Sequence, residues 1–357
     1  MPLVAHTPLP TFARLREQGQ EVVPLERALH QDIRELHIGL LNMMPDAALA
    51  ATERQFMRLV GNSNQIAQFY VHPFSLPALQ RGDDGRAYVE KYYSSFDDIK
   101  QLGLDALIIT GANVANPTLE QEPFWEPLME VATWAHENIA STLCSCLATH
   151  ALLRHKYEIE RRPLSNKRWG VYSHRVTQTD HPLLRNINTR FDAPHSRNNG
   201  ISRYQMEAAG LPILAESRKA GVHLAVSRDQ FRTVYFQGHP EYDIESLLKE
   251  YKREVMRFLT NERADRPPHP VNYFSPEAGE IAERYIDAAM LAREWGDPLP
   301  PFPEGEIRPF IDNTWGDTGK AIVNNWLGLV YKLTNHDRAK QFMDGIDPDD
   351  PLGLGNN

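Results

Sequence analysis

The chain contains two cysteines, and one of them, Cys146, stands where a nucleophile is expected. Residues 141–145 predict a short strand and residues 148–155 are compatible with a helix, so Cys146 lies at the turn between them. A thiol at a helix N-terminus is biased toward the thiolate by unpaired N–H groups and the helix dipole. Taken alone, a buried structural thiol is the commoner interpretation. Cys144 is the rival nucleophile, but we expect it to point to the opposite face of the strand from the turn that carries Cys146.

A histidine and a glutamate, His239 and Glu241, lie two residues apart in the segment 237–243. This segment closes a predicted strand and precedes a predicted helix, so His239 should lie at the carboxyl edge of the sheet, where ligands gather. Glu241 would hold the imidazole or favour its protonated form, as a base that takes a thiol proton and returns it to a leaving group requires. The alternative is an ordinary loop histidine in a turn where Asp243 caps the next helix.

Backbone N–H groups at the same edge supply a second element of acyl-transfer chemistry. Gly111 and Ala112 follow an apolar strand over 105–110, and Leu147 directly follows the cysteine. Their N–H groups are suited to an oxyanion hole, although Gly111 and Ala112 are equally compatible with a plain strand-ending turn. The polar segment 193–197 would contact a small zwitterion, or form a solvated loop.

The histidines give no indication of a metal site. His195 and the others lack the spacing to Cys, Asp or Glu that structural zinc sites show, so we assign no metal. A phosphate-binding loop of the GxxxxGKS type is also absent from the sequence. The chemistry predicted from the sequence therefore depends on side chains and backbone N–H groups alone.

The amino-acid composition of the chain indicates which kinds of partner it is suited to bind. The chain has 357 residues, of which 41% are hydrophobic and 24% charged, and its mean hydropathy of -0.48 argues against a membrane-spanning protein. A net charge of -9 with scattered basic residues gives no support to nucleic-acid or membrane binding and favours a small-molecule partner. The two cysteines are too close for a good structural disulfide. The N-terminal residues lack a secretory pattern, so we expect the cytoplasm.

Strands and helices alternate in the first half of the chain. This order predicts an α/β fold of the flavodoxin or Rossmann kind, a mostly parallel sheet with helices on both faces. The second half is richer in strands and includes a predicted hairpin. We expect strands at 36–41, 67–71, 105–110, 141–144, 222–227 and 231–237, and helices at 50–60, 124–136, after Asp243, at 276–295 and at 320–333.

We divide the chain into three parts. Residues 1–34, rich in proline, form an N-terminal arm packed over the body. Residues 35–262 form the α/β catalytic domain. Residues 263–357 form a C-terminal helical extension packed on the same body, and the role of its stretch 276–303, as a dimer contact or a lid, is left open.

Six segments, in order along the chain, resemble the homoserine O-succinyltransferase family, whose fold is similar to the class I glutamine amidotransferases. The resemblance spans roughly residues 20–335. Two residues near the nucleophile depart from the family pattern, with Leu147 in place of an aromatic residue and His150 in place of a glutamine. The matching segments are 41–45, 52–59, 109–112, 193–197, 238–243 and 271–274.

The resemblance implies a ping-pong acyl transfer by a catalytic triad. Cys146 is then the acyl-accepting nucleophile, His239 the general base and acid, and Glu241 its orienting partner. Succinyl-CoA acylates the thiolate, CoA leaves, and the hydroxyl of homoserine attacks the thioester. Succinyl-CoA is a co-substrate, no cofactor is expected, and the oligomeric state implied is a homodimer.

The resemblance also implies contacts for the substrates. Lys167, Ser196 and Arg253 match positions that contact substrate, and the Arg253 guanidinium is suited to a carboxylate. Ala115 matches a position where a small residue goes with succinyl transfer and a glutamate with acetyl transfer. A glutamate would repel the terminal carboxylate of a succinyl group, whereas the methyl group of Ala115 does not.

Other functions compete with this interpretation. A homoserine O-acetyltransferase would use the same machinery, and the acceptor, homoserine or serine, is open. A glutaminase-type amidotransferase would use the same triad, but the sequence shows no second catalytic domain with a nucleotide motif. A non-enzymatic binding protein would have no need of Cys146, His239 and Glu241 together.

Overall fold

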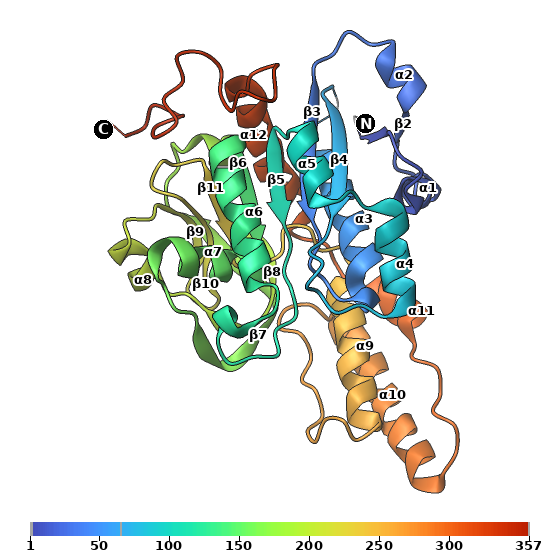
Figure 1. Cartoon of the computed structure of the whole chain (residues 1–357). Coiled ribbons are helices and arrows are strands. Elements are labelled where there is room, and N and C mark those ends of the chain that lie inside the picture. The colour runs from blue at the N-terminus through green and yellow to red at the C-terminus, as the bar shows by residue number, and fades with distance from the viewer. Residues whose placement is uncertain (1–2, 65, 356–357) are drawn as a thin grey trace.

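The computed structural model describes residues 3–64 and 66–355 and contains a nine-stranded sheet flanked by helices (Figure 1). The strand order is β4-β3-β5-β6-β11-β10-β9-β7-β8. The strands are β3 (Glu35–Leu41), β4 (Gln68–Phe74), β5 (Ala106–Ile109), β6 (Ser141–Ser145), β7 (Arg162–Val176), β8 (Arg190–Gly200), β9 (Ile213–Ser217), β10 (Gly221–Val226) and β11 (Thr233–Phe236), with a separate parallel pair of β1 (Val4–Ala5) and β2 (Val23–Pro24).

The first five strands of this order pair in parallel, which confirms the predicted α/β fold. They are buried on both faces, as parallel strands connected by helices generally are. The remaining strands are added in antiparallel pairs, including the predicted hairpin of β10 and β11. The helices are α1 (Pro10–Glu17), α2 (Leu25–Leu29), α3 (Asp46–Ser63), α4 (Asp83–Tyr92), α5 (Phe96–Leu102), α6 (Trp125–Asn138), α7 (Leu147–Tyr157), α8 (Arg203–Ala208), α9 (Ser246–Leu259), α10 (Pro276–Trp295), α11 (Glu304–Ile307) and α12 (Gly316–Leu333).

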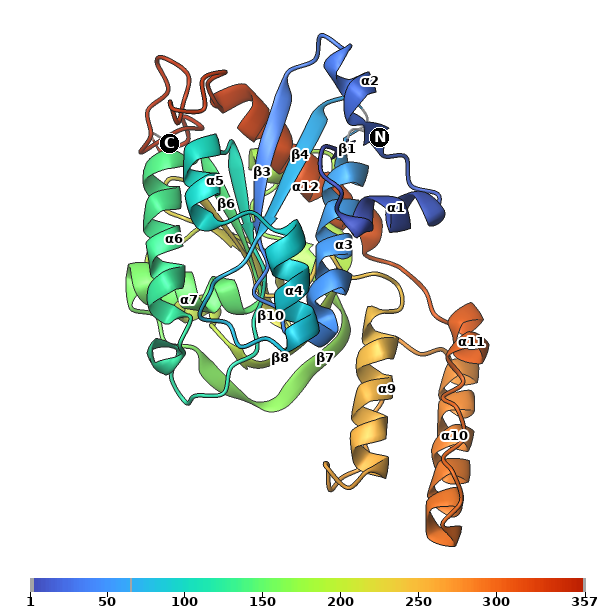
Figure 2. The same ribbon diagram turned by 45° about the vertical axis from the view of Figure 1, so that its right-hand side comes forward.

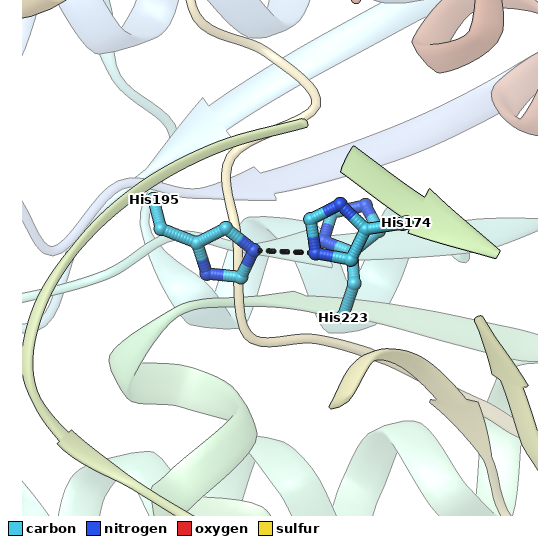
Figure 3. A group of neighbouring side chains, drawn as sticks. All are labelled: His174, His195 and His223. Carbon is cyan, nitrogen blue, oxygen red and sulfur yellow. Dashed lines mark hydrogen bonds between the residues drawn. The ribbon is translucent and has the colours of Figure 1, made fainter. Parts of the chain in front are cut away.

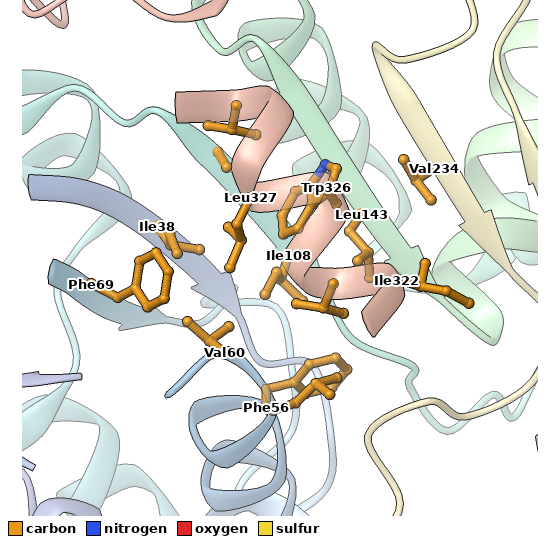
Figure 4. Packing of buried hydrophobic residues seen from close by; sticks show 14 of the residues in the cluster. Ile38, Phe56, Val60, Phe69, Ile108, Leu143, Val234, Ile322, Trp326 and Leu327 are labelled. Atoms are coloured by element: carbon orange, nitrogen blue, oxygen red, sulfur yellow. The ribbon is translucent and has the colours of Figure 1, made fainter. Parts of the chain in front are cut away.

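Two hydrophobic clusters fill the two faces of the parallel strands. Side chains of α3 and α12 pack on one face, as Figure 4 shows, and side chains of α6 and α7 pack on the other. Alternate residues of β6 illustrate the division, because Leu143 belongs to the first cluster and Cys144 to the second. The indole N–H of Trp326 on α12 donates to the Ser141 hydroxyl at 2.8 Å, which anchors this helix to β6.

The two ends of the chain pack differently on this body. Leu3, Phe12 and Leu15 of the N-terminal segment are buried in the same cluster as α3. Helices α9 and α10 project from the body side by side, and α12 then returns to the sheet (Figures 1 and 2). The boundaries of the three predicted parts remain predictions.

The start of α9 differs from the sequence prediction. The helix after Asp243 begins at Ser246, with Glu245 at the cap position, so the predicted capping role of Asp243 is wrong. The Asp243 side chain instead pairs with the guanidinium of Arg58, which is a stronger partner than a backbone N–H group.

Among the helices of the described residues, none combines the length and the apolar character needed to cross a membrane.

Candidate active site

Cys146 occupies a sharp turn between β6 and α7, as the sequence predicts. Its φ and ψ angles are 52° and −108°, in a region that non-glycine residues rarely adopt, and its N–H donates to the Phe236 carbonyl at 2.8 Å. Strain of this kind persists where the surrounding structure enforces it, and it is common at active sites. Because β5, β6 and β11 run in parallel, their carboxyl ends bring Gly111, Cys146 and the 237–243 segment to one edge of the sheet.

The two cysteines differ sharply in environment. Cys144 is fully buried in the core that α6 and α7 form with the sheet, and this burial raises its pKa to about 12. Cys146 is partly exposed, and both thiols are free. Of the two thiols, Cys146 is therefore the one that a substrate can reach, whereas the expected opposite orientation of Cys144 remains a prediction.

His239 is held by the carboxylate of Glu241. The Nδ1 atom of His239 lies 2.8 Å from Oε1 of Glu241, and the Ser145 hydroxyl lies 3.3 Å from the same oxygen. A carboxylate only accepts, so Nδ1 carries a proton. The other ring nitrogen, Nε2, is buried without a hydrogen-bond partner among the residues described. The Tyr242 ring stacks on the imidazole, with the ring centroids 4.1 Å apart.

The electrostatics of this pair favour a charged imidazole. Burial alone would lower the pKa of His239, but the negative charges of Glu241 and Cys146 outweigh it and raise the pKa well above its usual value. An imidazolium next to a thiolate is the state that a cysteine nucleophile requires.

The backbone after β5 lies against Cys146. A methyl group placed on Gly111 would lie 3.7 Å from Cβ of Cys146 and 3.9 Å from the backbone N of Leu147. The Thr110 hydroxyl fixes this loop, because it accepts a hydrogen bond from Met43 N at 2.9 Å and donates to the Gly111 carbonyl at 2.9 Å. The structure thus brings Gly111, the adjacent Ala112 and Leu147 to the thiol.

The start of the loop that carries His239 is held in place by hydrogen bonds of the Gln237 side chain. The Gln237 amide donates to the carbonyls of Ile201 and Val222 at 3.0 and 2.9 Å, and its oxygen accepts from Ile201 N at 2.8 Å. The same oxygen accepts from Nε2 of His150 at 3.1 Å. Burial lowers the pKa of His150 to about 3, so its ring is neutral. His150, one of the two departures from the family pattern, therefore supports the loop that carries His239.

Three buried histidines lie beneath this loop, and sequence analysis did not find them as a group. His174, His195 and His223 come from β7, β8 and β10, and their nearest ring nitrogens lie within 4.8 Å of one another (Figure 3). Such a group has the spacing of a metal site. The hydrogen bonds of the three histidines, however, differ from those expected around a metal ion.

The protons of this histidine cluster can be assigned from partners that only donate or only accept. Arg197 Nε donates to Nδ1 of His195 at 3.3 Å, so His195 carries its proton on Nε2 and donates to Nε2 of His174 at 3.1 Å. His174 in turn donates from Nδ1 to the Tyr172 carbonyl at 2.8 Å. The two facing Nε2 atoms are joined by a hydrogen bond, and the guanidinium of Arg197 contacts the other ring nitrogen of His195, so the arrangement does not suit a dication.

The cluster is tied to the catalytic loop through Gly238. A methyl group at Gly238 would come within 2.9 Å of His195 Nε2 and within 2.7 Å of His223 Nδ1, so only glycine fits. The next residue, His239, donates from its backbone N to the Pro194 carbonyl at 2.9 Å. The histidine cluster and the Pro194 carbonyl therefore support the backbone of the loop that carries His239.

Known proteins resemble this chain over most of its length. Residues 2–336 match the family model described as homoserine O-succinyltransferase. The homoserine O-succinyltransferase of Nitrosococcus oceani is 63% identical, over 99% of each chain, and that of Methylococcus capsulatus is 61% identical, over 99% of this chain and 100% of the relative. A solved glutamine amidotransferase from Thermotoga maritima is 12% identical over 83% of this chain and 98% of that chain, with a TM-score of 0.43.

The chain belongs to the homoserine O-succinyltransferase family.

The three residues expected to contact substrate lie in two places. Lys167 and Ser196 converge on Glu250 of α9, whose Oε2 lies 3.4 Å from Lys167 Nζ and 2.5 Å from Ser196 Oγ. Arg253, one turn further along α9, lies 3.5 Å from Glu254, with 61% of its side chain exposed. The structure thus brings two of the three together.

Glu250 is the residue that sequence analysis missed. Besides Lys167 and Ser196, it accepts a hydrogen bond at 2.6 Å from the hydroxyl of Tyr242, whose ring stacks on His239. The only signal in the sequence is its place three residues after Leu247, on the apolar side of a predicted helix.

The Ala115 loop is fixed by a buried carboxylate. The N–H groups of Ala115 and Asn116 both donate to Oε1 of Glu122, each at 2.7 Å, while the Ala115 side chain is exposed. Burial lowers the pKa of nearby Arg161, and the charges of Glu122 and Cys146 oppose this effect. A cation therefore lies within electrostatic range of both the loop and the nucleophile.

Proposed function

We propose that the protein transfers the succinyl group of succinyl-CoA to the hydroxyl of L-homoserine through a thioester on Cys146. The observation that carries the proposal is the strained Cys146 turn beside the hydrogen-bonded pair of His239 and Glu241. The family membership supports the substrates. This reaction is an acylation step of methionine biosynthesis, which we expect in the cytoplasm, carried out by a homodimer without a cofactor.

In the first half-reaction, the Cys146 thiolate attacks the thioester carbonyl of succinyl-CoA. The negative charge that develops on the carbonyl oxygen is stabilised by backbone N–H groups of the Gly111–Ala112 loop and of Leu147. When the bond to the CoA sulfur breaks, the imidazolium of His239 gives its proton to that sulfur. CoA leaves as a thiol, and His239 is left neutral beside the succinyl thioester.

In the second half-reaction, the homoserine hydroxyl attacks the thioester carbonyl. Neutral His239 takes the hydroxyl proton on Nε2, while Glu241 stabilises the imidazolium that forms. The carbon–sulfur bond then breaks, and O-succinylhomoserine leaves. The Cys146 thiolate and the His239 imidazolium return together to the starting state, so protons and charge balance over the cycle.

The residue type at position 115 supports a succinyl donor. The side chain of Ala115 is small, uncharged and exposed, so it would not repel the terminal carboxylate of the donor. Lys167 and Ser196 would contact the amino acid, with Arg253 at the edge of the site. We expect Ala115→Glu to shift the donor preference toward acetyl-CoA by at least roughly tenfold in kcat/KM. Gln121→Glu, which adds the same charge at another exposed position nearby, is the matched control and should leave the preference unchanged.

One experiment tests the proposal. The protein is incubated with L-homoserine or L-serine and with succinyl-CoA or acetyl-CoA, and release of free CoA is followed. We expect the highest kcat/KM for succinyl-CoA with homoserine. A preference for acetyl-CoA would instead assign an acetyltransferase, a preference for serine would change the acceptor, and no CoA release with any pair would refute acyl transfer.

A further inference from the structure

The turn between β3 and α3 carries two neighbouring methionines in different surroundings. Met43 is 1% exposed and packs in the hydrophobic cluster that α6 and α7 form with the sheet. Met44 is partly exposed and belongs to none of the hydrophobic clusters of the described residues. The segment 41–45 is one of those that resemble the family, yet the proposed reaction gives it no role. The side chain of Met44 is therefore not explained by packing of the core.

Met44 lies beside the nucleophile. Apart from its chain neighbours, the atoms nearest to a methyl group placed on Gly111 are Cβ of Cys146 at 3.7 Å, the backbone N of Leu147 at 3.9 Å and Sδ of Met44 at 3.9 Å. These are ordinary van der Waals distances, so the space over Gly111 admits a small group without a clash. An acyl group on Cys146 needs space of this kind next to N–H groups that bind its oxygen. The Met44 thioether forms one wall of that space.

Hydrogen bonds fix the backbone of the turn that carries Met44. The N–H of Met44 donates to Oδ1 of Asn42 at 3.2 Å, and the carbonyl of Met44 accepts from Arg81 at 3.3 Å. Asn42 itself is fully buried. The N–H of Met43 donates to the Thr110 hydroxyl at 2.9 Å, which ties the turn to the loop after β5. The fold therefore determines that Met44 lies over Gly111.

The proposed chemistry requires that water be kept from the thioester. Neutral His239 can accept a proton on Nε2 from water as well as from the homoserine hydroxyl. Water would then attack the thioester carbonyl, the carbon–sulfur bond would break, and succinic acid would leave, with the thiolate and the imidazolium restored. The Tyr242 ring covers one face of the imidazole, whereas Cys146 is partly exposed. The side of Cys146 therefore needs a cover of its own.

We propose that Met44 is the apolar wall that keeps water from the succinyl thioester on Cys146 and so favours transfer over hydrolysis. This inference rests on the proposed function, because it requires the acyl-enzyme. A thioether suits the role, because it is a weak hydrogen-bond acceptor and its unbranched chain adapts to the shape of a neighbouring group. A polar side chain at this position would instead hold a water molecule next to the thioester.

Three substitutions separate the polarity of the side chain from its volume. Met44→Leu keeps an apolar side chain of similar volume, Met44→Gln keeps the length but adds an amide, and Met44→Ala removes most of the side chain. Each protein is mixed with succinyl-CoA, and the burst of CoA release gives the acylation rate. After excess succinyl-CoA is removed, mass spectrometry follows the decay of the succinyl adduct. Decay in buffer gives hydrolysis, and the additional decay with L-homoserine gives transfer.

We expect Met44→Gln and Met44→Ala to raise the ratio of hydrolysis to transfer by roughly tenfold or more, with little change in the acylation rate. Met44→Leu should keep a ratio close to that of the wild type. An unchanged ratio in Met44→Gln and Met44→Ala would overturn the proposal, and so would an equal rise in Met44→Leu. Acylation and transfer that fall together without faster hydrolysis would also overturn it and assign Met44 to holding the loop after β5.

The matched control is the same substitution at a methionine away from the site. Met290 on α10 is 37% exposed, and Met290→Ala should leave the ratio of hydrolysis to transfer unchanged. A rise equal to that in Met44→Ala would show a general effect on the protein and refute the proposal. Wild-type protein that forms no succinyl adduct would refute the proposed function itself. A wild-type adduct that decays as fast in buffer as with homoserine would refute only the exclusion of water.

Discussion

His239 and the three histidines of the cluster below it are all buried, yet their protonation is opposite. The pKa of His239 is raised well above its usual value, whereas burial lowers that of His174 to about 4 and those of His195 and His223 well below the usual value. Burial is therefore not what distinguishes them.

The difference lies in the charged partner. His239 has the Glu241 carboxylate at 2.8 Å and the Cys146 thiol near its other side. The cluster has no carboxylate within hydrogen-bond distance among the described residues, and its charged neighbour is the guanidinium of Arg197. A carboxylate turns a buried imidazole into an acid–base group, and its absence leaves a neutral hydrogen-bonding unit suited to support.

The largest loss of activity should come from removing the thiol of Cys146, which is the second charged partner of His239. Cys146→Ala should abolish turnover while leaving the fold intact, because only the covalent step is lost. Mass spectrometry after mixing wild-type protein with succinyl-CoA alone should show one succinyl adduct, on the peptide region of Cys146. Cys144→Ala is the matched control and should remain active, and an adduct that persists in Cys146→Ala would move the nucleophile to Cys144.

Removing the imidazole itself should have the next largest effect. His239→Ala should lower kcat/KM by on the order of 10²–10⁴, the usual contribution of a positioned acid–base group. His155→Ala, at an exposed histidine on α7, should leave the rate unchanged. A loss of less than tenfold in His239→Ala would mean that another group moves the proton.

Glu241 tests whether the carboxylate sets the charge of His239. Because Glu241 raises the pKa of His239, Glu241→Gln should lower it, and the alkaline limit of the acylation rate should move to lower pH by roughly 1–3 units. The rate at neutral pH should fall less than in His239→Ala, and the double variant should be little worse than His239→Ala alone. A fully additive double variant would assign Glu241 another role.

Local sequence patterns were sufficient to predict the strand and the helix on either side of Cys146. The strand before Cys146 and the helix after it follow from short-range hydrophobic periodicity, and parallel strands place their carboxyl ends at one edge whatever the details of the loops. His239 and Glu241 are two residues apart, so their contact needs no long-range information.

The rest of the site depends on pairing that the sequence does not reveal. His174, His195 and His223 lie on three strands whose antiparallel registers bring them together, and a shift by one residue would turn each side chain to the other face. Glu250 is placed by the packing of α9 against β7 and β8, which fixes its contacts with Lys167 and Ser196. Asp243 shows the same limit. Its predicted role as a helix cap is replaced by an ion pair with Arg58, a residue distant in the sequence.

The smallest effect expected concerns stability rather than activity. A histidine whose pKa is lowered in the folded state contributes stability above its unfolded pKa of about 6.5, and this contribution is lost as the pH falls, because only the unfolded chain binds the proton. His223 takes no part in the hydrogen bonds that join Arg197, His195 and His174. Replacing it removes a titrating group without breaking that chain of hydrogen bonds.

The free energy of unfolding should fall between pH 7 and pH 5 in both proteins. We expect this fall to be smaller in His223→Leu than in the wild type, by up to about 2 kcal/mol. The measurement is the free energy of unfolding by urea at each pH, and the pH dependence is compared rather than the absolute value, which a change in packing also alters. His155→Gln, at an exposed histidine, is the matched control and should keep the wild-type dependence. An unchanged dependence in His223→Leu would mean that His223 is protonated in the folded protein, and the contrast between the cluster and His239 would then fail at that residue.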